Sequence, residues 1–294
     1  MSKKVTEERP NILLITADQL KRDALSIYGN REVKTPHLDK LSWDGVVFDN
    51  HFTQNPQCSP ARASIFTGRN PRAHGLRANG VRMRRGETTL AHVLKENGYK
   101  TGAFGKMHLT PQVGIENHPD ENWPEDNFGF STLHLTNDSK KGEYLEDLEK
   151  QDYESYKYVK QQGEDKIQEE MSGEIESEGA PQVKENKIDP DLHQTPWITD
   201  QYINFLRENQ DTPSFGWVSF VDPHHPFDPP DPYASMYDYK DISTPKWREG
   251  EMKDKPPHFE KMINGEGPGN EKYDFKTLTK DIYRRVKAKY YGMI

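Results

Sequence analysis

The sequence of 294 residues lacks several features that would narrow its function at once. It has a single cysteine, Cys58, which excludes an internal disulfide. No apolar run is long enough to cross a bilayer, and residues 1–9 lack the apolar core of a secretory signal. Its 40 basic and 48 acidic residues give a net charge of -8, which does not indicate the positively charged surface that binds nucleic acid. We therefore expect a cytoplasmic protein with no membrane or nucleic-acid partner, unless a leader before residue 1 has been removed.

Charged residues are concentrated in one segment. Across the chain 30% of the residues are charged and 32% are apolar, which indicates that part of the chain stays outside a core. The run from Asp138 to Lys187 consists mostly of Lys, Glu, Asp, Gln, Ser and Gly. Such a run is typical of a solvated helix or a mobile insertion. We predict a charged peripheral insertion over residues 138–190.

Short apolar runs alternate with segments of helical pattern. Residues 11–16 form a continuous apolar run after Pro10, which is typical of a strand buried on both faces of a parallel or mixed sheet. Further strands are expected at 99–105 and 214–220, and helices at 36–44 with Thr35 as N-cap, at 61–66, 88–98 and 195–208, and from about residue 280. This alternation predicts an α/β fold with a central mixed, largely parallel sheet between helical layers.

Polar groups follow the predicted strands. Asp18 and Gln19 come after the first strand, and their side-chain oxygens are hard ligands suited to Ca²⁺ or Mg²⁺. Lys106 and His108 follow the second strand and, two residues apart on an extended segment, would face the same side. In open α/β sheets ligands bind at these strand ends. His224 and His225 follow the strand expected at 214–220. Singly, each residue also has a structural reading: Asp18 can cap a helix, Lys106 can be a surface charge and His224 can be a turn residue.

Cys58 stands just before the helix predicted at 61–66, which Gly68 can end. A helix N-terminus favours an anion because its free N–H groups and its dipole point there. Arg62 lies about one helical turn further on and offers fixed donors. The alternative reading is a buried structural cysteine, which is the commoner fate of a free thiol.

Four segments resemble, in the same order, the motifs of type I sulfatases, a family of the alkaline phosphatase superfamily. They are Thr16-Ala17-Asp18-Gln19, Cys58-Ser59-Pro60-Ala61-Arg62 with Thr67-Gly68-Arg69, Gly105-Lys106-Met107-His108-Leu109, and Pro223-His224-His225-Pro226-Phe227. The resemblance runs from Pro10 to Phe227 apart from the charged segment, and resumes weakly at Tyr290–Ile294. It implies an alkaline phosphatase/sulfatase-like fold and a sulfatase catalytic domain over residues 10–294.

The resemblance implies a modified nucleophile and a metal. Cys58 would be oxidised to formylglycine, a built-in cofactor whose hydrate attacks the ester, and a formylglycine-generating or maturase enzyme would be a partner. Asp18, Gln19 and residue 58 would bind Ca²⁺, with Mg²⁺ or Mn²⁺ as alternatives. The implied activity is the hydrolysis of small sulfate esters.

The same resemblance implies roles for the remaining polar residues. Arg62 would hold the modified residue, and Lys106 would contact the sulfate oxygens. His224 would protonate the departing alcohol or phenol, and His108 would remove the proton whose loss expels sulfate. His225 would at most contact the substrate or support its neighbour.

Two departures from the family pattern keep other functions open. Gln19 replaces the usual aspartate, as in branches that resemble phosphonate monoester hydrolases, so a phosphonate monoester or phosphodiester hydrolase is an alternative. Members of the family also carry a metal-binding segment beyond the position of Ile294, so we expect a domain incomplete at its C-terminus, and a truncated, non-catalytic fragment is another alternative. The last alternative function is a binding module that uses an unmodified Cys58. The sequence leaves the natural substrate open, and oligomers are allowed.

Overall fold

The computed structural model describes residues 9–111, 125–172, 182–246, 248–264 and 278–294. These residues form two compact units. The first, which we call the sheet unit, comprises the described residues of 1–18, 49–147 and 194–221. The second, the helical unit, comprises those of 19–48, 148–193 and 222–294. The chain therefore enters each unit more than once.

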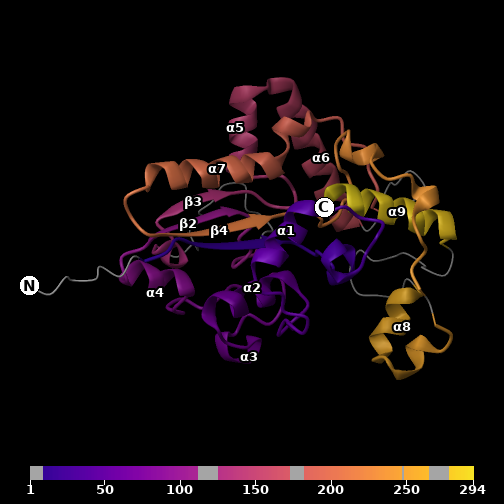
Figure 1. Ribbon diagram of the computed structural model, residues 1–294, viewed down its shortest axis with the longest axis horizontal. Coiled ribbons are helices and arrows are strands. Elements are labelled where there is room, and N and C mark those ends of the chain that lie inside the picture. Colours follow the sequence, from indigo (N-terminus) through magenta and orange to yellow (C-terminus); the bar gives the residue numbers. More distant parts are fainter. Residues whose placement is uncertain (1–8, 112–124, 173–181, 247, 265–277) are drawn as a thin grey trace, which may run out of the picture. The chain divides into compact units, whose positions relative to one another are not determined.

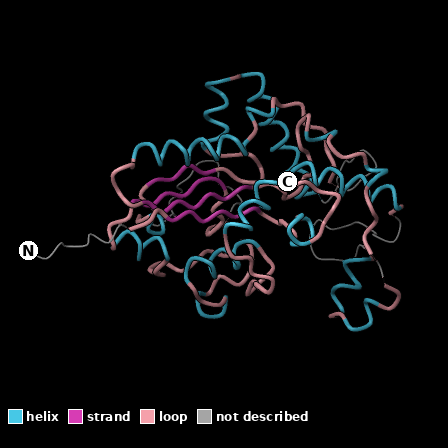
Figure 2. Tube along the Cα trace, in the orientation of Figure 1, coloured by secondary structure: helices cyan, strands magenta, loops and turns pink. Residues whose placement is uncertain are grey.

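The sheet unit contains a sheet of four strands in the order β1-β4-β2-β3, with every ladder parallel (Figures 1 and 2). The strands are β1 (Ile12–Ala17), β2 (Lys100–Gly105), β3 (Thr132–Leu135) and β4 (Ser214–Phe220). Ala17 pairs with Phe220, and Gly105 pairs with Ser219, so the three longer strands end side by side. The predicted α/β class and largely parallel sheet are confirmed, and Asp18 and Lys106 both leave this edge.

Helices cover both faces of this sheet. Figure 1 shows α7 (Gln194–Glu208) along one face, with α2 (Cys58–Thr67), α3 (Pro71–His74) and α4 (Leu90–Glu96) on the other. Successive side chains of β4 point to opposite faces, so Trp217 joins the core on the α2 side and Val218 joins the core on the α7 side. The helical layers predicted from the sequence are therefore present.

The first strand differs from its prediction. Leu13 and Ile15 are 44% and 53% exposed, whereas Ile12 and Leu14 pack against the core. The expectation that this strand is buried on both faces is wrong, because β1 is an edge strand of the described sheet and one of its faces is open.

Gly105 lets the chain turn sharply at the end of β2. Its φ is +92°, a region that favours glycine, and a Cβ atom there would lie 2.1 Å from the carbonyl oxygen of Ser219. The close approach brings the next backbone N–H, that of Lys106, to the same carbonyl at 3.0 Å. Glycine is thus required at position 105, immediately before Lys106 at the end of β2.

The helical unit is built around aromatic side chains. Tyr290 and Tyr291 of α9 (Lys280–Met293) pack with Ala24, Val33 and Ile242. Further helices are α1 (Pro36–Asp44), α6 (Tyr153–Ser172) and α8 (Pro257–Ile263), while α5 (Glu143–Gln151) spans the boundary between the units. Short 3-10 helices are Arg22–Ala24, Ser26–Tyr28, Pro190–Leu192, Tyr233–Ser235, Tyr239–Asp241 and Glu251–Asp254 here, and Asn127–Gly129 in the sheet unit.

The first long helix is capped differently from its prediction. The helix at Pro36 begins and ends where predicted, but the Thr35 hydroxyl does not cap it and instead accepts a bond from the Ser26 N–H at 3.2 Å. The charged run contains the whole of α5 and α6, the helices that its composition allowed. None of the described helices combines the length and apolarity needed to cross a membrane.

An ion pair in the helical unit predicts a pH-dependent stability. Burial acts to raise the pKa of Glu32, but hydrogen bonds from Lys287 and Ser243 outweigh it and lower that pKa to about 2. Because the folded pKa is depressed, the stabilisation is complete above pH 4.5 and is lost as the pH falls towards 2. We expect Glu32→Gln to lower the free energy of unfolding at pH 7 by about 2 kcal/mol, discounted for partial exposure.

The measurement is the difference in free energy of unfolding between wild type and Glu32→Gln, taken at pH 7 and at pH 3. Glu154→Gln is the matched control, since its carboxylate is 81% exposed and pairs with Lys157 on the surface. A Glu32→Gln effect of equal size at both pH values would contradict the ion-pair explanation.

Candidate active site

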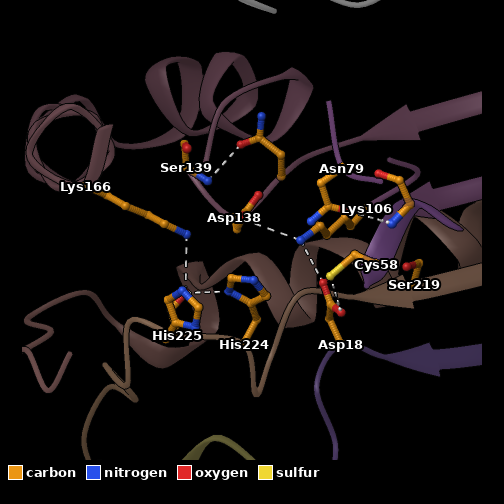
Figure 3. Close-up of polar contacts among 12 residues, drawn as sticks. Asp18, Cys58, Asn79, Lys106, Asp138, Ser139, Lys166, Ser219, His224 and His225 are labelled. Carbon is orange, nitrogen blue, oxygen red and sulfur yellow. Dashed lines mark hydrogen bonds and ion pairs between the residues drawn. The ribbon is translucent and has the colours of Figure 1, made fainter. Parts of the chain in front are cut away.

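Asp18 is the central carboxylate of the sheet unit. Its backbone N–H donates to the carbonyl of Phe220 at 3.1 Å, which extends the β1–β4 ladder by one residue and fixes the strand end. Its side chain is 8% exposed, and Oδ2 lies 2.7 Å from Nζ of Lys106, which is fully buried (Figure 3). A buried ammonium requires such a partner, so the surface-charge reading of Lys106 is wrong.

Cys58 is the first residue of α2, which begins three residues before the helix predicted at 61–66, so the expected place of Cys58 at a helix N-terminus is confirmed. Its Sγ lies 3.5 Å from Oδ1 of Asp18, and the thiol donates to the carboxylate. Burial, followed by the negative charge of Asp18, raises the pKa of the Cys58 thiol. The unmodified cysteine is therefore a neutral thiol at pH 7 and lacks the thiolate character of a reactive cysteine.

Arg62 connects the helix to the strand ends. From one turn along α2 it reaches Asp18 Oδ2 at 3.5 Å and donates to Ser219 Oγ at 2.7 Å. It also donates to the backbone carbonyl of Lys106, and its guanidinium lies over the ring of Trp217 at 5.6 Å from the centroid. Asp18 thus has two buried cations beside it, both held in fixed orientations.

His108 lies in the same polar environment, but not on an extended segment. Its φ is +55°, so the predicted alternation with Lys106 along one strand does not hold. Burial, and then the positive charge of Lys106, lowers the pKa of His108 to about 3. The imidazole is consequently neutral at pH 7, the state in which a histidine accepts a proton. Its Nδ1 is buried and has no hydrogen-bond partner among the described residues.

Sequence reasoning missed polar neighbours of this cluster. Asp138 Oδ2 lies 3.6 Å from Lys106 Nζ, although the residue had been assigned to the charged insertion. Asn79 Oδ1 accepts from the backbone N–H of Ser59 at 3.1 Å and so satisfies an N–H in the first turn of α2 (Figure 3). Asn79 follows no strand, so the rule that led to the other residues could not identify it.

Gln19 belongs to the helical unit, where a tyrosine holds its backbone. Its φ is +61°, and its carbonyl accepts from the Tyr290 hydroxyl at 2.8 Å. The same hydroxyl oxygen accepts from the backbone N–H of Lys21 at 2.8 Å. Burial raises the pKa of Tyr290 to about 12, so the hydroxyl keeps its proton. Tyr290 lies in the weakly matching C-terminal motif, and sequence reasoning had assigned it no role.

His224 and His225 also belong to the helical unit. His224 is 8% exposed, its Nδ1 lies 2.6 Å from the carbonyl oxygen of His225, and the two rings stack with centroids 4.2 Å apart. The roles assigned to His224 and Gln19 by resemblance remain predictions. The structure brings Asp18, Cys58, Arg62, Lys106 and His108 together in the sheet unit.

The residues around Asp18 fit part of a site for a hard divalent cation. Asp18 offers a buried carboxylate, and an oxygen in place of Cys58 Sγ would add a ligand next to it. Lys106 and Arg62 supply the opposite charge that an anionic ligand of that cation needs. A carboxylate-based oxygen set of this kind suits Ca²⁺, Mg²⁺ or Mn²⁺ better than a soft metal.

Comparisons with known proteins agree with this geometry. The family model described as Sulfatase matches residues 10–294. An arylsulfatase of Clostridium perfringens (strain 13 / Type A) is 32% identical over 296 residues, which cover 97% of this chain and 56% of that protein. The steryl-sulfatase of Rattus norvegicus is 40% identical over 111 residues, which cover 34% of this chain and 19% of that protein. The chain thus spans little more than half the length of the arylsulfatase.

A solved structure supports the fold. The crystal structure of the phosphonate monoester hydrolase of Agrobacterium radiobacter superposes with a TM-score of 0.72 at 29% identity, covering 97% of this chain and 56% of that one. The predicted alkaline phosphatase superfamily fold is confirmed by this similarity. Because the family model matches nearly the whole chain, from residue 10 to residue 294, the chain belongs to the sulfatase family.

Proposed function

We propose that the protein hydrolyses sulfate esters and that formylglycine made from Cys58 is its nucleophile. The observation that carries the proposal is the place of Cys58 at the start of α2, 3.5 Å from the Asp18 carboxylate and one turn before Arg62. The unmodified thiol is a poor nucleophile there because its pKa is raised. The same position suits a hydroxyl of an aldehyde hydrate, which Asp18 can orient.

Residue 58 as an aldehyde hydrate would supply the attacking hydroxyl, and a divalent cation held by Asp18, with Gln19 as the further ligand that the family resemblance implies, would stabilise negative charge on the ester. Lys106 and Arg62 add fixed positive charge that the sulfate oxygens need as the sulfur–oxygen bond breaks. His224 gives a proton to the departing oxygen, so that an alcohol or phenol leaves. His108, neutral at pH 7, accepts the proton whose loss from residue 58 releases sulfate.

A phosphonate monoester hydrolase is the second candidate. Gln19 favours it, because the Asp-Gln form of the first motif resembles that of the phosphonate monoester hydrolase branches. The similarity to the phosphonate monoester hydrolase of Agrobacterium radiobacter points in the same direction. A maturation enzyme that oxidises Cys58 is a required partner under either candidate.

The test is turnover of an aryl sulfate and of the matching aryl phosphonate monoester, with and without added Ca²⁺, by the complete gene product. We expect kcat/KM to be higher for the sulfate and to fall when the metal is chelated. Preference for the phosphonate would replace the first candidate by the second. Turnover of neither substrate by the chain of 294 residues, with no saturable Ca²⁺ binding, would favour the truncated, non-catalytic alternative.

A further inference from the structure

A lysine from the charged segment is buried beside the histidine pair. Lys166 lies on α6, whose other lysines at 157 and 160 are exposed, yet its side chain is only 5% exposed. Its Nζ donates to the backbone carbonyl of His225 at 3.3 Å (Figure 3). Burying an ammonium is costly unless it is well paired, so simple solvation of α6 does not explain this position.

The carbonyl of His225 also determines the protonation of His224. A carbonyl oxygen can only accept, so the 2.6 Å contact requires a proton on Nδ1 of His224. Nε2 is then the ring nitrogen that can exchange a proton with a substrate. The carbonyl has two lone pairs, and the ammonium of Lys166 and the imidazole of His224 both donate to it.

We infer that Lys166 is a positioning residue for His224 and acts through the carbonyl of His225. The ammonium fixes the direction of that carbonyl, and the carbonyl in turn fixes the ring plane and the tautomer of His224. The stacked rings at 4.2 Å limit the remaining rotation of the imidazole. The inference rests on the proposed role of His224 as the proton donor to the leaving oxygen.

If Lys166 positions His224, the loss of kcat on replacing Lys166 should depend on the leaving group of the substrate. A general acid matters most when the departing oxygen is strongly basic, and misplacing a catalytic group by about 1 Å can cost about 100-fold in rate. We expect Lys166→Met to lower kcat about 10- to 100-fold for sulfate esters of weakly acidic alkylphenols. The sulfate of a strongly acidic nitrophenol, which leaves without a proton, should lose less than about threefold.

The experiment measures kcat across a series of aryl sulfates in the complete gene product, for wild type, Lys166→Met, His224→Ala and the double variant. Lys160→Met is the matched control, because Lys160 is exposed on the same helix and its Nζ contacts Tyr156. The control should behave as wild type. In the double variant, Lys166→Met should add no further loss for the weakly acidic leaving groups.

The results for Lys166→Met and His224→Ala distinguish a failure of the positioning role of Lys166 from a failure of the proposed acid role of His224. Equal losses for all leaving groups in Lys166→Met, or no loss, would overturn the positioning role while His224→Ala retained its leaving-group dependence. A His224→Ala variant without that dependence would overturn the acid role and the inference with it. If Lys166→Met fails to fold, Lys166→Gln, which keeps an N–H donor, should show the same pattern with smaller losses, and a uniform loss there would count against the positioning role.

Discussion

Replacing Cys58 with alanine is expected to lower kcat for an aryl sulfate by at least about 10,000-fold, as loss of a covalent nucleophile does in other hydrolases. The variant lacks the Sγ that is lost when Cβ is oxidised to an aldehyde, so an alanine at position 58 cannot become formylglycine. It leaves Asp18, Arg62 and Lys106 in place, so substrate binding should weaken much less than turnover. The measurement is kcat and KM for the wild type and Cys58→Ala, produced in the same host.

Ser59→Ala provides the matched control for that result. Ser59 is the next residue of α2, is fully buried, and its hydroxyl has no hydrogen-bond partner among the described residues. Its removal should leave kcat within about twofold of wild type, as expected when no interaction is lost. A Cys58→Ala variant that kept more than a tenth of the activity would rule out residue 58 as the nucleophile.

Lys106→Met is expected to have the next largest effect, on both stability and turnover. The ammonium lies 2.7 Å from Asp18 and 3.6 Å from Asp138, so its loss leaves two carboxylates beside an apolar group. Breaking a buried pair in this way typically costs about 3–5 kcal/mol of folding stability. If Lys106 stabilises the transition state as proposed, loss of its charge should lower kcat about 100- to 1,000-fold.

The measurements are the free energy of unfolding and the kcat of the folded variant. Lys100→Met is the control, because Lys100 is at the start of the same strand and exposed. It should change neither quantity appreciably. A Lys106→Met variant as stable and as active as wild type would show that the Asp18–Lys106 pair has no role in the site.

Much of the sheet unit could be predicted because its elements carry local signals. The run 214–220 and the helix before it were predicted almost to the residue, since an apolar strand and a proline near a helix start are visible without neighbours. β3 was not predicted, because four residues give too short a pattern to recognise. The exposure of Leu13 was also missed, because a strand's position in the sheet depends on its partners.

In the candidate site, too, some residues could be predicted from local signals and others could not. Asp18, Arg62 and Lys106 were predicted, since strand ends and helical spacing bring such residues together. Tyr290 was missed, because its bond to Gln19 joins residues 271 positions apart. Lys166 was missed because a charged run suggests a solvated helix, and its burial depends on tertiary contacts that composition does not encode.

The central claim is that residue 58 works as formylglycine, and mass spectrometry of the peptide that contains it tests this claim most directly. The protein should be produced in a host that has the modifying machinery and should be shown to turn over an aryl sulfate. The account predicts a peptide lighter than the encoded one by the difference between CH₂SH and CHO, with an aldehyde that reacts with a hydrazide. An active preparation in which Cys58 is entirely an unmodified thiol would contradict the account.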